Sequence, residues 1–236
     1  MYIGARAAAS RYAFRLGDAL AIASPSSPEA RMKPEVDALR RSSDETPYVS
    51  HPVAVAAPEH LAAVATLFGL SPQPPATARV LGLGCASGGH LIPLAMRSPD
   101  ATFVGIDLSP VQVEAGRRTI AALGLTNIEL HAADLSALDP GLGTFDYIVA
   151  HGLYSWVPAE VQERILPICR KHLSPAGLPF VSYNTYPGWK FREALRDAMR
   201  FGSAGIAAPQ ERLATARGLV EFIARSAPPD SVTGRV

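Results

Sequence analysis

The chain has 236 residues and a formal net charge of +1, and 48% of its residues are hydrophobic. This length suits one domain of moderate size, or one domain and a piece of another. The nearly neutral charge gives no electrostatic basis for binding nucleic acid or an anionic membrane surface, so neither is an expected partner. Cys85 and Cys169 provide no disulfide framework, and the six histidines show no metal-ligand spacing. No apolar run is long enough to span a membrane, which favours a cytoplasmic protein.

Residues 1–45 differ in composition from the rest of the chain. They begin with an arginine-rich, acid-poor segment and continue through a serine–proline stretch at 24–28, so we expect a disordered or poorly ordered extension. Met32 would serve as a start site, and an over-extended start is therefore an alternative interpretation. Helical periodicity appears at 58–70, where the residues on one face are Leu61, Val64, Ala65 and Phe68.

A strand, a glycine turn, a helix and a second strand come next. Residues 79–81 are an apolar strand that enters a glycine cluster, and the apolar run at 102–106 ends on Asp107. This is the layout of a nucleotide-binding βαβ unit. We expect the amides of the turn and the start of the helix to face an anionic group. We expect Asp107 to accept hydrogen bonds from both hydroxyls of a ribose. The alternative is that the glycines serve only a tight turn.

Strands and helices alternate through the rest of the chain. Ser109 is expected to cap a helix at 110–123 that Gly124 ends. Further strands are predicted at 127–133, 145–150 and 178–183, and further helices at 158–173 (closed by residues 174–177), 191–200 and 211–227. Right-handed crossovers then give an α/β fold with a doubly wound, mostly parallel sheet. Its ligand crevice would lie at the carboxyl ends of the strands, which are Gly84, Asp107, Asp134, His151 and Asn184.

Two of the residues near the strand ends have alternative interpretations. Asp134 can accept a hydrogen bond from the exocyclic amine of adenine, or it can cap the turn that follows. Cys85 lies in the glycine turn, where a thiolate would be stabilised at a helix N-terminus. No histidine base is identifiable beside it, so we interpret it as a small turn residue.

Aromatic residues follow the fourth and fifth strands. Tyr154 and Trp156 are expected to line a substrate channel, and a buried aromatic cluster is the alternative. Tyr183 and Asn184 would face the same crevice from the other side. Tyr48 would reach over the site from the N-terminal segment.

A dehydrogenase is an alternative that the sequence disfavours. The glycine spacing at 82–88 fits a dinucleotide fingerprint, and Tyr186 with Lys190 matches the tyrosine–lysine pair of short-chain dehydrogenases. That pair works only when one helical turn separates its members. Pro187-Gly188 lies between them, which favours a turn over a helix interior.

Four ordered strings resemble the motifs of class I S-adenosylmethionine-dependent methyltransferases: VLGLGCASGG, FVGIDLSPVQ, NIELHAAD and FDYIVAHGLYSWVP. The more specific strings AHGLYSWVP and VSYNTYPGW resemble one bacterial subgroup. Its members carry a C-terminal methyltransferase regulatory domain and include the rickettsial-type protein lysine methyltransferases. The resemblance covers about residues 46–225.

The resemblance implies a Rossmann-like methyltransferase fold, S-adenosylmethionine as cofactor, and a protein or small-molecule methyl acceptor, with protein lysine as one candidate. It leaves the oligomeric state open. The residues expected at the cofactor are Tyr48, Gly84, Cys85, Ala86, Gly88, Asp107, Leu108, Gln112, Asp134, Leu135 and His151. A lysine amine buried among aromatic rings loses its proton more easily. The residues expected to act on it are Tyr154, Trp156, Tyr183 and Asn184.

Three departures from the family pattern and the length of the chain qualify this expectation. Gly82 stands where the family usually has an acid, Ala56-Ala57 where it has Thr-His, and His90 where it has asparagine. A class I sheet normally ends with two more strands, so we expect a truncated product that lacks them. The cofactor-binding domain would cover 46–200, and 201–236 would be the helical start of a truncated C-terminal region. A binding module or degenerate enzyme without turnover is the alternative function.

Overall fold

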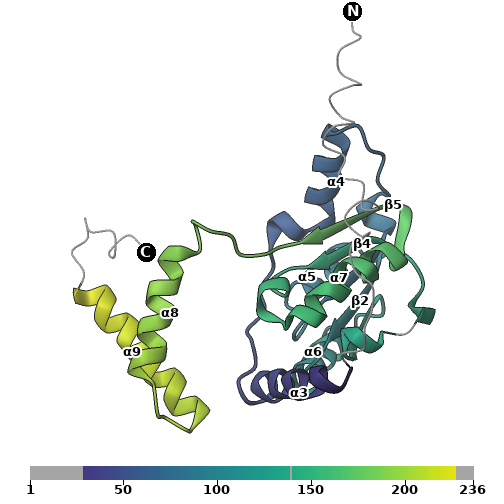
Figure 1. Cartoon of the computed structure of the whole chain (residues 1–236). Coiled ribbons are helices and arrows are strands. Elements are labelled where there is room, and N and C mark those ends of the chain that lie inside the picture. The colour runs from purple at the N-terminus through teal and green to yellow at the C-terminus, as the bar shows by residue number, and fades with distance from the viewer. Residues whose placement is uncertain (1–28, 139, 227–236) are drawn as a thin grey trace, which may run out of the picture. The chain divides into compact units, whose positions relative to one another are not determined.

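The computed structural model describes residues 29–138 and 140–226, and the chain divides into two compact units between Tyr183 and Asn184. The first unit is built on a five-stranded parallel sheet with the strand order β3-β2-β1-β4-β5 (Figure 1). Its strands are β1 (Arg79–Leu83), β2 (Thr102–Asp107), β3 (Ile128–Ala132), β4 (Phe145–Ala150) and β5 (Leu173–Val181). The predicted doubly wound α/β fold is confirmed.

Helices precede β1 and connect later strands of this unit. They are α3 (Glu29–Glu45), α4 (Pro58–Leu67), α5 (Leu91–Arg97), α6 (Pro110–Leu123) and α7 (Ala159–His172). The ends of α6 are those that the sequence predicts. The Ser109 side chain accepts a hydrogen bond from the Gln112 N–H at its start, and Gly124 ends it with a φ of 66°. In the part of the chain that is described, none of the helices is long and apolar enough to cross a membrane.

Each face of the sheet packs against its own set of helices. On β1, Val80 belongs to a core that includes Leu91 from α5 and Val113 from α6. The next residue, Leu81, belongs to a second core that includes Ile165 from α7. Successive side chains of a strand point to opposite faces, so both faces of the sheet are buried. The chain runs outward from β1 to β2 and β3 on one side and to β4 and β5 on the other, which opens a crevice at the carboxyl ends of the strands.

The N-terminal segment differs from its prediction. Residues 29–45 were expected to be disordered, but they form the helix α3, which packs against α6. Val36 is buried there, so the helix is stabilised by tertiary contact that its polar composition does not reveal. The rest of the predicted extension, residues 1–28, lies outside the described residues.

The fifth strand begins earlier than predicted. Residues 174–177 were expected to close the preceding helix, but β5 already starts at Leu173. The Ser174 hydroxyl donates to Asp146 Oδ1 at 2.8 Å, which holds this segment beside β4. The pairing with β4 is irregular there, and β5 lies at the edge of the described sheet. An edge strand tolerates Pro175, because a missing N–H costs little on the unpaired side.

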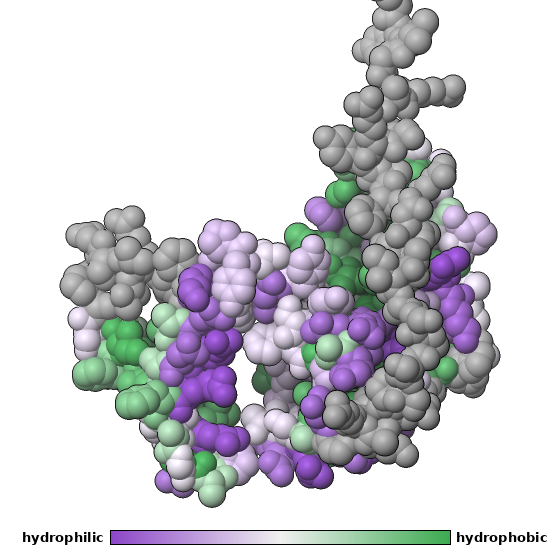
Figure 2. All heavy atoms as spheres, viewed as in Figure 1, coloured by the Kyte–Doolittle hydropathy of each residue, from purple (hydrophilic) through white to green (hydrophobic). Residues whose placement is uncertain are grey.

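The second unit contains α8 (Lys190–Gly202) and α9 (Pro209–Ser226), which pack against each other. The predicted boundary at residue 200 would place α8 in the first unit, whereas its contacts place it in the second. On the face shown in Figure 2, hydrophilic side chains gather over α8 and hydrophobic ones over α9. Phe222 of α9 is exposed.

Candidate functional site

A cavity of about 410 Å³ lies at the carboxyl ends of β1, β2 and β3. Most of the residues that the sequence assigns to the cofactor line it. They are Tyr48, Gly84, Ala86, Asp107, Leu108, Gln112, Asp134 and Leu135. A second cavity of about 120 Å³ shares Tyr48, Gly84 and Ala86 with the first, and it adds the predicted residues Cys85 and His151. The shared residues make the two cavities neighbours in one site.

Asp107 is held in place by backbone amides. Its Oδ2 accepts from the Ala86 N–H at 2.7 Å, and its Oδ1 accepts from the Ser109 N–H at 2.9 Å. Burial raises the pKa of the Asp107 carboxyl, the hydrogen bonds from Ser109, Ala86 and Leu108 oppose the rise, and the charge of Asp44 adds to it. A carboxylate offers about four lone-pair sites, and the Ala86 and Ser109 amides use one on each oxygen, so each oxygen can still accept a ribose hydroxyl.

The glycine turn corrects one expectation. The amides of the turn and of the helix start were expected to face an anionic ligand, but four of them donate within the protein: those of Gly84 and Cys85 to the Ile106 carbonyl, that of Gly88 to the Cys85 carbonyl, and that of Gly89 to Ser50 Oγ. The conformation of the turn explains the glycines, because φ is 69° at Gly84 and 78° at Gly88. Ala86 also has a positive φ of 50°, held by its bond to Asp107. Gly88 lines neither cavity, and a Cβ there would meet Ile92 and Leu130.

Residues 46–53 form a strap that lies against the glycine turn. Ser50 Oγ accepts from the Gly89 N–H at 2.9 Å, and the Val53 N–H donates to His90 Nδ1 at 3.2 Å. A Cβ at position 89 would collide with the carbonyl oxygen of Ser50, so the strap requires glycine there. Burial lowers the pKa of His90, which keeps Nδ1 free to accept. The strap positions Tyr48, which lines both cavities, as the sequence predicts.

The larger cavity also has polar groups that suit a base with hydrogen-bonding edges. Asp134 caps the next turn through its Oδ1, which accepts from the Ser136 N–H at 2.8 Å, and it also lines the cavity. Both interpretations of Asp134 are therefore compatible with its position. Gln112 is 4% exposed, and its Oε1 has no hydrogen-bond partner among the residues that the structure describes. A buried polar atom without a partner is unfavourable, so a ligand donor in the cavity would satisfy it.

Three cavity residues come from α3, where the sequence predicted disorder. They are Val36, Leu39 and Ser43. No signal in the sequence linked this segment to the site, because its pattern is polar and its contacts lie far away in the chain. Ser50 and His90 were also missed as structural supports of the site.

The predicted substrate residues are only partly brought together. The rings of Tyr154 and Tyr183 lie 6.0 Å apart, but neither residue is among those that line the two cavities. Trp156 lines the larger cavity. His151 lines the smaller one, and its ring lies 6.2 Å from that of Phe180. Asn184 is the first residue of the second unit, and its role stays a prediction.

Cys85 and Gly82 limit the chemistry of the smaller cavity. Burial, and then the charge of Asp107, raise the pKa of the Cys85 thiol, which argues against a thiolate nucleophile. Gly82 also lines this cavity, and a Cβ built there would lie 2.8 Å from Leu91 Cδ1. Leu91 thus occupies the space that a longer side chain at 82 would need. Among the described residues, no group of three or more histidine, cysteine or acidic side chains is placed to hold a metal ion.

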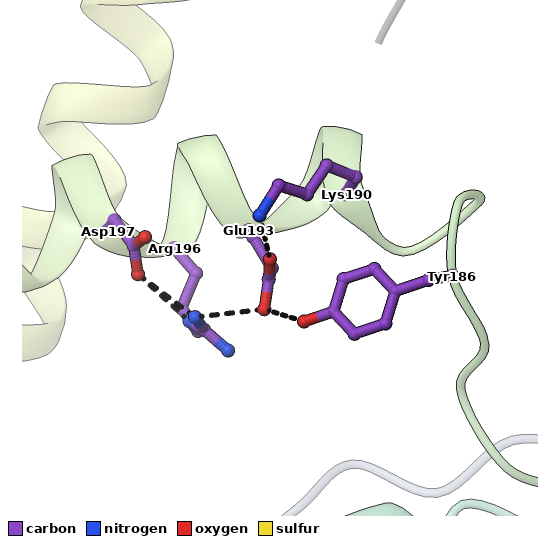
Figure 3. Close-up of polar contacts among 5 residues, drawn as sticks. All are labelled: Tyr186, Lys190, Glu193, Arg196 and Asp197. Atoms are coloured by element: carbon purple, nitrogen blue, oxygen red, sulfur yellow. Dashed lines mark hydrogen bonds and ion pairs between the residues drawn. The ribbon is translucent and has the colours of Figure 1, made fainter.

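The tyrosine–lysine pair of the dehydrogenase alternative lies in the second unit (Figure 3). Residues 186–189 form a turn, as the sequence predicts. The Tyr186 hydroxyl donates to Glu193 Oε1, and this bond is the main cause that raises the pKa of Tyr186. Lys190 Nζ lies 5.6 Å from the centre of the Tyr186 ring and pairs with Glu193. A phenol whose pKa is raised is a poor proton shuttle at neutral pH.

Comparison with known proteins points to one family. Residues 80–177 match the family described as "Methyltransferase domain". The chain is 44% identical over 180 residues to the uncharacterized protein RP789 of Rickettsia prowazekii. This match covers 76% of this chain and 32% of RP789. It is 40% identical over 182 residues to RP028 of the same organism, and this match covers 77% of this chain and 73% of RP028.

A solved structure of PKMT2 from Rickettsia typhi in complex with AdoHcy (S-adenosylhomocysteine) has the same fold. Its TM-score is 0.68 at 40% identity, and the match covers 79% of this chain and 36% of that chain. The chain thus spans about a third of the length of RP789 and of PKMT2. The fold, the strand-end carboxylate and these relatives lead to one conclusion. The chain belongs to the class I S-adenosylmethionine-dependent methyltransferases, whose cofactor is S-adenosylmethionine, and it resembles the rickettsial protein lysine methyltransferases.

Proposed function

We propose that this chain binds S-adenosylmethionine and transfers its methyl group to a lysine side chain of a protein. The observation that carries the proposal is the larger cavity, which is lined by the aligned Asp107 carboxylate, by Asp134 and by Gln112, whose Oε1 has no partner among the described residues. The cavity would take the adenosine, with the ribose at Asp107 and the base toward Asp134. The methionine end would extend to the smaller cavity beside Cys85 and His151.

The chain's own residues would contribute alignment and desolvation. When bound, the cofactor supplies a methyl group activated by a sulfonium. The lysine nitrogen would accept this methyl group through its lone pair and release a proton, and the cofactor would leave as its demethylated thioether. The amine must therefore arrive unprotonated. Tyr154, Tyr183 and Trp156 would lower its pKa by removing water from it.

Protein lysine is proposed as the acceptor because of similarity. The chain is 40% identical to PKMT2, and the match covers 79% of this chain and 36% of PKMT2. The strings AHGLYSWVP and VSYNTYPGW, at the ends of the fourth and fifth predicted strands, also resemble the rickettsial-type protein lysine methyltransferases. Tyr154 and Tyr183 come from those two strings, and their neighbouring rings are suited to surround one aliphatic amine.

The test is a tritiated-methyl assay of the full chain on lysate proteins and on small-molecule extracts. We expect label on protein, on lysine after hydrolysis, and a loss of more than tenfold in rate for Tyr154→Ala and Tyr183→Ala. Label confined to small molecules would contradict the acceptor assignment. Full turnover in both variants would contradict the role of the rings.

A second candidate is a module that binds the cofactor without turnover. Two observations favour this candidate. Gly82 lines the smaller cavity but has no side chain with which to hold the cofactor, and Leu91 fills the space beside it. Binding of S-adenosylhomocysteine in calorimetry, together with no label in any fraction, would favour this candidate. The proposed transferase requires both binding and label.

A further inference from the structure

Asp44, near the end of α3, contacts the site through one buried side chain. The Ser109 hydroxyl donates to Asp44 Oδ1 at 2.5 Å. Ser109 is fully buried, and its Oγ also accepts from the Gln112 N–H at 3.2 Å. The backbone N–H of the same residue donates to Asp107 Oδ1 at 2.9 Å. Ser109 therefore connects Asp44 directly to the carboxylate that would hold the ribose.

The helix that carries Asp44 also forms part of the larger cavity. Val36, Leu39 and Ser43 of α3 line this cavity together with Asp107 and Gln112. The Asp44–Ser109 bond lies next to Ser43 in the chain, at the end of α3 that leads into the strap. An ionised acceptor makes this hydrogen bond about twice as strong as one between neutral groups. The bond thus fixes both the wall of the cavity and the cap of α6.

We propose that Asp44 is a positioning residue for the cofactor: through Ser109 it fixes the Asp107 carboxylate and holds α3 as a wall of the adenosine cavity. This inference rests on the assignment of the larger cavity to adenosine, and it is independent of the methyl acceptor. Without the Asp44 carboxylate, the Ser109 hydroxyl loses its acceptor inside the protein. The Ser109 amide and α3 would then be free to shift, and both would loosen the contact with the ribose.

Asp44 has a second, opposing effect that separates this role from a purely structural one. Its charge raises the pKa of Asp107, as burial does more strongly. Among the described residues, the Cys85 thiol also interacts with the charge of Asp107, and its raised pKa keeps it neutral. Asp44→Asn keeps an oxygen acceptor for Ser109 and removes the charge, whereas Asp44→Ala removes both. The two variants should therefore behave differently with pH.

The experiment is calorimetric titration of the full chain with S-adenosylhomocysteine and with 5′-methylthioadenosine, which lacks the amino-acid end. We expect Asp44→Ala to lower the affinity for both ligands by about tenfold, the equivalent of one moderate hydrogen bond. We expect Asp44→Asn to bind both within about twofold of the parent at neutral pH, and to keep its affinity to a lower pH than the parent. The matched control is Asp37→Ala on the same helix, since Asp37 pairs with the exposed Arg40 in a bond worth little.

Three results would overturn the proposal. Unchanged affinity in Asp44→Ala would show that Ser109 needs no acceptor on α3. An equal loss in Asp37→Ala would show that any weakening of α3 has the same effect. If Asp44→Ala lost affinity for S-adenosylhomocysteine but kept its affinity for 5′-methylthioadenosine, the effect would lie at the amino-acid end of the cofactor. A parent chain that binds neither ligand would instead remove the adenosine assignment on which the proposal rests.

Discussion

At the scale of single residues, the site depends on Asp107. The sequence predicted this residue because an acid at the end of a second apolar strand has few structural reasons to be there. The use of the turn amides could not be predicted in the same way. Which carbonyl each amide meets depends on how closely β2 and the strap approach the turn, and the strap is fixed by Ser50 and His90 at long range.

Affinity for S-adenosylhomocysteine is expected to fall as the pH is lowered, and the fall is expected to begin at a pH above 3.8. Burial raises the pKa of Asp107 above its ordinary value of 3.8. Binding needs the ionised carboxyl, so it is complete above the raised pKa and is lost as the pH falls through it. The unliganded fold has the opposite dependence, because it binds this proton more tightly than the unfolded chain and gains stability as the pH falls through the same pH range. Calorimetry over a pH series measures the first effect. Constant affinity down to pH 3.8 would contradict it.

Gly89→Ala is expected to destabilise the first unit by about 1–3 kcal/mol, the usual cost of overpacking. The added methyl would collide with the Ser50 carbonyl oxygen, which is backbone and cannot rotate away. Urea unfolding measures the change. Gly188→Ala is the control, because its Cβ would find its nearest neighbour, the Thr185 carbonyl oxygen, only at 3.8 Å. Equal, small effects in both variants would show that the strap moves easily.

At the scale of elements, the sequence was most reliable where local signals and tertiary contacts agree. The helix α6 has its serine cap, its proline at the first position and its terminal glycine, and its predicted bounds are confirmed. The helix α3 has no such signals and depends on packing against α6. The start of β5 was missed because Ser174-Pro175-Ala176-Gly177 has the composition of a helix stop, while pairing with β4 decides its structure.

Asn127 holds the turn between α5 and β2, and its contacts predict the order of stability of two variants. Its side-chain amide nitrogen lies 3.0–3.1 Å from three carbonyl oxygens, those of Ala95, Ser98 and Ala101, between α5 and β2. Asn127→Ala is expected to cost about 1–3 kcal/mol, because these acceptors lose their donor. Asn127→Asp should cost more, since it presents a carboxylate to three carbonyl oxygens. Chemical denaturation measures both. An aspartate variant more stable than the alanine variant would contradict this account of the turn.

At the scale of the whole molecule, the residues proposed for the cofactor all lie in the first unit. The alternation of strands and helices was sufficient to predict the sheet and the edge at which ligands bind. It was not sufficient to place the aromatic residues. Tyr154 and Tyr183 depend on loop conformations after β4 and β5, and the position of Asn184 depends on the second unit. The cofactor site is therefore predictable from sequence to a much greater extent than the acceptor site.

The central claim is that the strand-end cavity binds an adenosyl cofactor through Asp107. The most direct test is calorimetric titration of S-adenosylhomocysteine into the full chain, into Asp107→Ala and into Asp100→Ala, which removes an exposed aspartate outside the site. We expect one ligand per chain for the parent and for Asp100→Ala, and a loss of affinity of about a hundredfold in Asp107→Ala, since two charge-assisted hydrogen bonds to the ribose disappear. No binding to the parent chain, or equal binding to all three proteins, would contradict the account.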